Sequence, residues 1–333
     1  MTKPCKAGIL GTGSCLPDRK LTNADLEKIV DTSDEWIVKR TGIRERRIID
    51  DETPLARLAA VAAENAVTDA GIEKDEIDMI IGATLTPDYL TPTLACSVQK
   101  ELNLSGVPAF DMNAACTGFV YALNVARQFI ENGTCGYVLI VAAEALSRVV
   151  NYRDRKTCVL FGDGAGAAVV GRVEDSTGII GCTVGAYGEL GYNLTIPCLY
   201  ASPEDIEKRI DGKRQVIWMN GSEVFAFAAK IMAEATLRVV SAASLSLNDL
   251  DYIFPHQANA RIIMNAVRHL RYPMEKVYSN LERTGNISAA SIPVCLDEAS
   301  RAGMLKKGDK IVLVAFGGGL TYGALLLSWS KSA

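Results

Sequence analysis

A cysteine, Cys116, stands where a short strand-like run changes into an apolar helix. Residues 107–111 form the run, small residues follow, and the apolar side chains then recur at helical spacing at Phe119, Leu123, Ala126 and Ile130. Backbone N–H groups and the positive end of the helix converge at this point, and both favour the thiolate, the nucleophilic form of cysteine. The alternative interpretation is an inert core cysteine, which is the usual state of a lone buried thiol.

Two later stretches carry polar side chains that suit a nucleophile. His256 follows a strand-like apolar run at 252–255, and sites in parallel sheets gather at the carboxyl ends of strands. Asn286 stands in a glycine turn ahead of an alanine-rich helix. The chain has only two histidines, so an imidazole that takes part in proton chemistry must be His256 or His269.

Three successive glycines, residues 317–319, end an apolar strand-like run near the C-terminus. Amides without side chains in the way suit the stabilisation of an oxyanion, although glycines of this kind also mark a simple strand bulge.

Trp36 and Arg40 stand four residues apart in a short predicted helix and therefore share one face. An indole beside a guanidinium forms a platform for a flat aromatic base and its phosphates. A tryptophan packed on arginine methylenes is the plainer interpretation, and the spacing alone favours it.

Composition excludes several classes of protein. The chain has 333 residues, 49% of them hydrophobic and 22% charged, and a net charge of −4, which argues against a general nucleic-acid binder. Its nine cysteines form no Cys-x-x-Cys pair, so we expect reduced thiols and no metal site. The sequence shows neither a signal peptide nor an apolar run long enough for a membrane span, and we expect a cytosolic protein.

Strand-like and helical segments alternate along the chain, which indicates an α/β fold with a parallel sheet covered on both faces. Residues 161–170 suggest a glycine-rich strand pair, and residues 187–215 suggest an irregular surface excursion. The segment 70–82 is repeated at 243–255, an offset of 173 positions. An offset of about half the chain predicts two similar halves. We place them at residues 1–173, with the cysteine, and 174–333, with the histidine and asparagine.

Three motifs, Ala115-Cys116-Thr-Gly-Phe, Pro255-His256-Gln-Ala-Asn259 and Gly285-Asn286-Ile-Ser-Ala-Ala-Ser, occur in this order on the two halves. Together they resemble the Cys-His-Asn triad of β-ketoacyl-acyl carrier protein synthase III, the initiating condensing enzyme of type II fatty acid synthesis. The likeness covers nearly the whole chain. It implies the thiolase fold, with two duplicated βαβαβαββ-type halves in a five-layer αβαβα arrangement, and a cytoplasmic homodimer without a permanently bound cofactor.

The resemblance also implies the substrates and the role of each site residue. Cys116 would take the acyl group from an acyl-CoA, and His256 and Asn286 would stabilise the enolate formed when malonyl-acyl carrier protein loses CO₂. The amides of Cys116 and Gly318 would form the oxyanion hole. The implied CoA-binding residues are Trp36, Arg40, Arg155 and Asn259, and Arg261 would lie on the face that docks the carrier protein.

The chain departs from the family pattern at three positions. Thr91 stands where many members have a phenylalanine that closes the acyl pocket across the dimer, and the smaller side chain predicts a longer acyl tunnel. The alternative is that Tyr89 or Leu90, just upstream in the same loop, turns inward and fills the space. Ala226 replaces a docking lysine of some members, and Ile287 replaces a common threonine.

Rival functions follow from the same motifs. A specialised relative that loads an unusual or longer starter in secondary metabolism would share the triad. A 3-hydroxy-3-methylglutaryl-CoA synthase would need a glutamate base, and no glutamate stands in a convincing place. A non-catalytic subunit would typically lack the cysteine, and a redox-sensing thiol would leave the histidine and asparagine unexplained.

Overall fold

The structure is a computed structural model that describes residues 6–174, 176–198 and 215–332. Its first sheet has the strand order β1-β7-β6-β4-β5. The strands are β1 (Lys6–Cys15), β4 (Met79–Ala83), β5 (Ala109–Met112), β6 (Tyr137–Ala145) and β7 (Asp163–Val173). β4 runs parallel to β5 and β6, whereas β7 runs antiparallel to both β1 and β6.

The second sheet has the order β11-β12-β13-β8. Its strands are β8 (Gly178–Ala186), β11 (Tyr252–Pro255), β12 (Lys310–Gly317) and β13 (Thr321–Ser328). Only β11 and β12 pair in parallel. Two small ribbons, β2 (Lys20–Thr22) with β3 (Glu45–Arg47) and β9 (Leu194–Thr195) with β10 (Trp218–Met219), lie beside the sheets.

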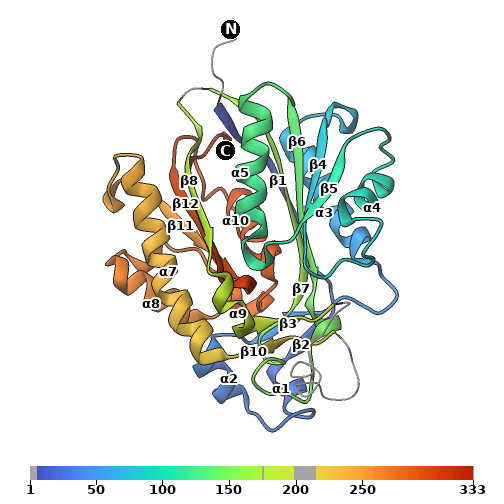
Figure 1. Cartoon of the computed structure of the whole chain (residues 1–333), viewed down its shortest axis with the longest axis vertical. Coiled ribbons are helices and arrows are strands. Elements are labelled where there is room, and N and C mark those ends of the chain that lie inside the picture. Colours follow the sequence, from blue (N-terminus) through green and yellow to red (C-terminus); the bar gives the residue numbers. More distant parts are fainter. Residues whose placement is uncertain (1–5, 175, 199–214, 333) are drawn as a thin grey trace.

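Helices cover both sheets and fill the space between them, which gives five layers (Figure 1). α3 (Leu55–Ala70) and α4 (Leu94–Glu101) pack on the outer face of the first sheet, and α7 (Gly221–Ala242) and α8 (Ala260–Leu270) on that of the second. α5 (Gly118–Glu131) and α10 (Ser291–Arg301) form the middle layer. The expected five-layer α/β fold is confirmed. The shorter helices are α1 (Asn23–Leu26), α2 (Asp34–Thr41) and α9 (Leu281–Thr284).

The middle layer explains why the α5 sequence is so apolar. Phe119, Leu123 and Ala126 are fully buried because α5 has a sheet on each side. Each large apolar side chain buried in this way contributes about 1.5–3 kcal/mol relative to exposure. This packing holds the N-terminus of α5, and with it Cys116, rigidly between the sheets.

The repeat seen in the sequence continues through most of both halves. β4 and β11 begin 173 positions apart, and so do the turns η2 (Ala115–Thr117) and η7 (Ser288–Ala290), the helices α5 and α10, and the strands β6 and β12. In the described part of the second half, the third strand of the pattern is reduced to a single parallel bridge between Ile253 and Val277.

Two predictions about the sheets are wrong. The first sheet is mixed rather than parallel, because β7 returns antiparallel along β6 and lies between it and β1. Of residues 161–170, those from Asp163 onward belong to one strand, β7, and do not form a strand pair. The glycines of β7 allow side chains of other elements to pack directly on the strand backbone. At Gly166, for example, an added Cβ would lie 2.8 Å from Pro293 Cγ. Of the predicted excursion at 187–215, residues 199–214 lie outside the described residues.

We propose that the two halves divide between residues 173 and 174, since β7 ends at Val173 and every strand of the second sheet follows. Within the described residues, no helix combines the length and the apolar character needed to cross a membrane.

Candidate active site

Cys116 lies in the tight turn η2 between β5 and α5. Ala115 takes a left-handed conformation with φ of 46°, and its N–H donates to Asn113 Oδ1 at 3.2 Å. The turn buries the thiol, which is 8% exposed as a residue, and burial raises its pKa to about 12. The prediction of a lowered pKa is therefore wrong, because loss of solvent raises the pKa by more than Ser288 and the Cys116 backbone lower it.

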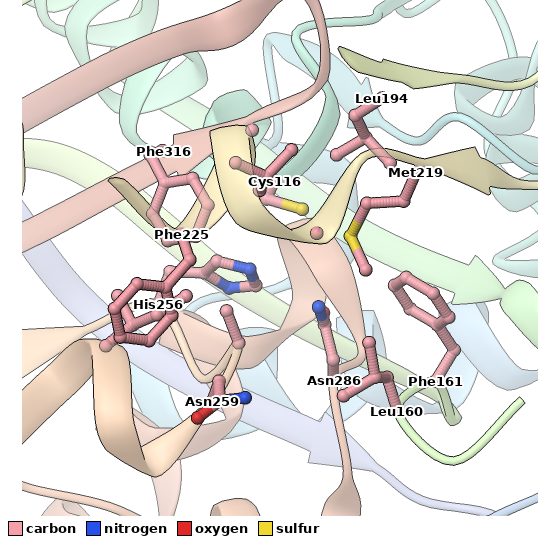
Figure 2. A pocket seen from close by; sticks show the side chains of 15 residues that line it. Cys116, Leu160, Phe161, Leu194, Met219, Phe225, His256, Asn259, Asn286 and Phe316 are labelled. Carbon is pink, nitrogen blue, oxygen red and sulfur yellow. The ribbon is translucent and has the colours of Figure 1, made fainter. Parts of the chain in front are cut away.

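Asn286 lies in a turn of the same shape in the other half. Ser288 has φ of 48°, and its N–H donates to Asn286 Oδ1 at 2.9 Å, as in the Cys116 turn. The backbone of Asn286 is held on both sides, because its N–H donates to Leu160 O at 2.8 Å and its carbonyl accepts from Gly162 N at 3.0 Å. The side-chain amide nitrogen is thereby left to face the cavity (Figure 2).

His256 follows β11, at the carboxyl end of the parallel pair β11–β12, as predicted. Its Nδ1 lies 2.7 Å from Ser291 Oγ, and its ring makes an edge-type contact with Phe316, with 5.6 Å between the ring centroids. Burial lowers the pKa of the imidazole to about 3, so the ring is neutral at ordinary pH. Its Nε2 is buried and has no hydrogen-bond partner among the described residues.

The three side chains meet in one cavity (Figure 2), whose wall is otherwise almost entirely apolar. The Cys116 sulfur, the His256 ring and the Asn286 amide face the same space. The apolar part of the wall includes Leu160, Phe161, Leu194, Met219, Val224, Phe225, Ile262 and Phe316. A cavity of this kind excludes water from a nucleophile and leaves few polar groups to orient a substrate.

The glycine run at the end of β12 lies against the nucleophile turn. A Cβ on Gly317 would be 2.7 Å from Cys116 N, so only glycine allows this approach. A Cβ on Gly318 would lie 3.4 Å from Ala115 Cβ, so the backbone of Gly318 is also next to the turn.

The predicted CoA platform lies on α2 and the segment after β6. The Arg155 guanidinium is 5.1 Å from the centroid of the Trp36 ring, and that of Arg40 is 5.9 Å from it. Asn259 lines the cavity and ties the platform to α8: its Nδ2 donates to Arg40 O at 3.2 Å, and its Oδ1 accepts from Arg261 N at 2.8 Å. Arg261 itself stacks on Phe225, with 5.5 Å to the ring centroid.

Thr91 lies apart from this cavity. It is exposed and follows Tyr89 and Leu90, which are each 63% exposed. None of the three lines the cavity in the described chain, so neither Tyr89 nor Leu90 fills the space of the missing phenylalanine within its own subunit.

Several residues of the site were missed in the sequence. Arg46 is fully buried, donates to Val159 O and Asn23 Oδ1, and packs on Gly285, so it supports the segment that holds Asn286. Ser291 orients His256. Glu144 is fully buried near Cys116, contrary to the expectation that no glutamate stands near the site.

The described residues contain no cluster of three side chains suited to a metal ion.

Known proteins match the chain over its whole length. The family models for the 3-oxoacyl-[acyl-carrier-protein (ACP)] synthase III domain and for its C-terminal domain match residues 110–188 and 240–329. A β-ketoacyl-[acyl-carrier-protein] synthase III from Caldanaerobacter subterraneus is 50% identical, covering 99% of this chain and 100% of the relative. One from Clostridioides difficile is 48% identical over 98% of this chain and 99% of the relative.

Solved structures agree. The 3-oxoacyl-[acyl-carrier-protein] synthase III from Aquifex aeolicus superposes with a TM-score of 0.90 at 46% identity, covering 97% of this chain and all of that one. The priming β-ketosynthase of the R1128 polyketide pathway has a TM-score of 0.92 at 34% identity and covers 100% and 99%. These similarities, with Cys116, His256 and Asn286 around one apolar cavity, show that the chain belongs to the β-ketoacyl-acyl carrier protein synthase III family, the acyl-transferring condensing enzymes that initiate fatty acid synthesis.

Proposed function

We propose that the enzyme transfers an acyl group from an acyl-CoA to Cys116 and then condenses it with malonyl-acyl carrier protein. The observation that carries the proposal is the meeting of Cys116, His256 and Asn286 at one apolar cavity. The cavity excludes water, which would hydrolyse the acyl-cysteine, and it strengthens each polar interaction made inside it.

The acyl transfer needs donors for the oxyanion of the tetrahedral intermediate. We assign this role to the backbone amides of Cys116 and Gly318. The close approach of the glycine run to the Cys116 turn supports the assignment, because two amides that face one point in a dry site stabilise the developing charge.

The condensation needs a different kind of help. When CO₂ leaves malonyl-acyl carrier protein, negative charge develops on the thioester oxygen, and no proton has to be abstracted. A neutral His256 and the Asn286 amide are suited to this step, since each can donate a hydrogen bond to that oxygen without carrying a charge.

Ser291 sets which nitrogen of His256 carries the proton. Its hydroxyl lies 2.7 Å from His256 Nδ1 and 2.8 Å from Ser288 O, and its single proton can go to only one of them. In the structure the hydroxyl donates to Ser288 O. We infer that in the condensation step it donates to Nδ1 instead, so that the ring proton is on Nε2 and faces the substrate.

Substrates reach the cavity along two surfaces. We assign the CoA nucleotide to the platform of Trp36, Arg40 and Arg155, with Asn259 at its inner end. The Arg155 guanidinium lies 5.1 Å from the Trp36 ring centre, so it must move outward to admit an adenine between the two groups. The carrier protein would dock over α8 at Arg261. The reaction needs no resident cofactor.

The starter and the assembly belong to the same proposal. A homodimer in the cytoplasm is the expected form, and in it the exposed loop of Thr91 would reach the acyl pocket of the second subunit. Thr91 lacks the bulk that would close such a pocket, which favours a starter longer than acetyl. A specialised role with an unusual starter is the second candidate function, and the same residue favours it.

Mass spectrometry tests the proposal. The protein is incubated with acyl-CoAs of graded length, and the intact mass is measured before and after cleavage into peptides. We expect one acyl adduct, on Cys116, and none in Cys116→Ser, because a serine hydroxyl is a far weaker nucleophile than a thiol in this site. An adduct on another cysteine, or normal transfer by the serine variant, would contradict the assignment.

A further inference from the structure

Glu144 is a fully buried carboxyl group near the end of β6 that the proposed reaction does not use. It accepts hydrogen bonds from Thr86 Oγ1 at 2.6 Å, Thr84 Oγ1 at 3.2 Å and the backbone N–H of Leu85 at 3.2 Å. A buried carboxyl group with three donors is held in a definite position, and donors of this kind favour its ionised form.

The two threonine hydroxyls are oriented toward Glu144 by their own partners. Thr84 Oγ1 accepts from Thr86 N at 3.1 Å, and Thr86 Oγ1 accepts from Ala145 N at 2.9 Å. Each hydroxyl oxygen already accepts a hydrogen bond from a backbone N–H. The hydroxyl proton is therefore available to donate to the carboxylate of Glu144. These donors oppose the effect of burial on the pKa of Glu144 without cancelling it, since the pKa is raised to about 7.

Ser288 connects Glu144 to the nucleophile. Its turn, η7, packs against both β6, which carries Glu144, and η2, which carries Cys116. The Ser288 hydroxyl is buried and has no hydrogen-bond partner among the described residues, and its effect is to lower the pKa of both Cys116 and Glu144. The repeat explains this placement. Glu144 and Gly317 occupy equivalent positions at the ends of β6 and β12, and a Cβ at Gly317 points at Cys116 N and Ala115 Cβ. In the repeat, Cys116 and Ala115 correspond to Ala289 and Ser288. The Cα–Cβ bond of Glu144 therefore points toward Ala289 and Ser288.

We propose that Glu144 is the proton acceptor for the Cys116 thiol, reached through the Ser288 hydroxyl. This rests on the proposed acyl transfer. As Sγ attacks the acyl carbon, the S–H proton passes to Ser288 Oγ while the Ser288 proton passes to the Glu144 carboxylate. The S–C bond forms, the bond to the CoA sulfur breaks, and CoA leaves as a thiolate that water protonates. In condensation Cys116 is released as a thiolate, and the same path in reverse returns the proton from Glu144.

His256 is the competing acceptor, and it is the weaker base of the two. Burial lowers the pKa of His256 to about 3, whereas burial raises that of Glu144 to about 7 against the opposing effect of Thr86 and its other donors. The proton has to leave a thiol whose own pKa is about 12. Among the described residues, Cys116 is the titratable group that faces Glu144. The other contacts of the Glu144 carboxyl group are with hydroxyl groups and a backbone N–H.

The rate at which iodoacetamide alkylates Cys116, measured from pH 5.5 to 9.5 by mass spectrometry, tests this proposal. The reagent needs no acyl-CoA site, so the result does not depend on the proposed substrates. We expect the wild-type rate to rise with an apparent pKa near 7. In Glu144→Gln the rate at pH 7 should fall about 100-fold, and the rise should move to the pH range of an unassisted buried thiol.

Three variants complete the experiment. Ser288→Ala should slow alkylation at pH 7 with the carboxyl cradle intact, and it serves if Glu144→Gln does not fold. Ser328→Ala, which removes a buried hydroxyl from β13 far from the site, should leave the rate unchanged. His256→Ala should keep the rise near pH 7. The proposal is overturned if Ser288→Ala and any folded Glu144→Gln protein react like the wild type, or if His256→Ala abolishes the rise.

Discussion

We propose that Cys116 acts in one half-reaction and His256 with Asn286 in the other, and single substitutions can separate the two. His256→Ala and Asn286→Ala should each form the acyl-enzyme but release CO₂ from malonyl-acyl carrier protein slowly, since each removes one donor to the enolate oxygen. The expected loss is about 2.7–4 kcal/mol of transition-state stabilisation, that of a lost oxyanion donor. Acylation is followed by intact mass and decarboxylation by labelled CO₂.

Ser291→Ala is the matched variant for His256. It leaves the ring in place and removes the hydroxyl that sets its proton, so it should slow CO₂ release less than His256→Ala and leave acylation unaltered. Normal CO₂ release from His256→Ala or Asn286→Ala would refute their assigned roles.

Glu144 should also appear in the pH dependence of stability. Its pKa rises from 4.5 to about 7 on folding, so between these values the folded protein binds more protons than the unfolded chain. Stability from this group is present below pH 4.5 and is lost as the pH rises through 7, at about 3 kcal/mol in total.

Urea unfolding at pH 5 and pH 8 measures this loss. Glu144→Gln should not show this pH-dependent loss of stability. The variant should therefore become more stable relative to the wild type as the pH rises. The contribution of His256 has the opposite sign, because its lowered pKa makes the folded state less stable as the pH falls below 6.5; it is present in both proteins and cancels in the comparison. Parallel pH profiles would show that Glu144 has no raised pKa.

Among the elements, the end of β12 makes a close contact with turn η2. Gly317→Ala would place a methyl group 2.7 Å from Cys116 N, so the turn must shift and the oxyanion donors with it. We expect acylation to fall by about 10²- to 10³-fold, as when one such donor is removed.

Gly181→Ala is the control for this change. It lies within β8, where the nearest atom to a new Cβ is Val239 Cγ2 at 3.7 Å, so the methyl group fits without displacement. Rapid-quench acylation of both variants, with circular dichroism to verify folding, makes the comparison. Equal rates for the two alanine variants would mean that the glycine run has no part in the oxyanion hole.

The same elements show what the sequence can predict. Cys116 could be found because it stands between a short strand and an apolar helix, His256 because it follows a buried strand, and Asn286 because it stands in a glycine turn. The antiparallel return of β7 could not be found, since a buried strand looks the same in either direction. Glu144 was missed because a charged residue near the end of an apolar strand usually has only a structural role. Its neighbour Ser288 lies in the other half of the chain, so the sequence does not show that the two are close. The direction of the Cys116 pKa was wrong because burial depends on packing that no local pattern shows.

At the scale of the whole molecule, Thr91 is exposed and does not line the cavity of its own subunit. If the loop closes the acyl pocket of a second subunit, Thr91→Phe should shorten the preferred starter. Each methylene that loses its place in an apolar tunnel loses about 0.8 kcal/mol.

Acetyl-CoA and octanoyl-CoA are made to compete for Cys116, and the adducts are weighed. Octanoyl should dominate in the wild type and acetyl in Thr91→Phe. A preference for acetyl in both proteins would indicate that Tyr89 or Leu90, carried on the same loop, already closes the pocket in the dimer.

The two like-shaped turns have a consequence for the ancestry of the site. The positions equivalent to Cys116, His256 and Asn286 in the other half are Ala289, Ala83 and Asn113. Both alanines are buried, and each would lie within 3.4 Å of a Cβ added at Gly118, so the space that a second centre would need is closed. The duplicated halves therefore share the backbone shape of the turn, Asn113 included, but only one set of positions carries the three side chains of the site. The other turn, η7, packs against η2 and β6 and supports the site.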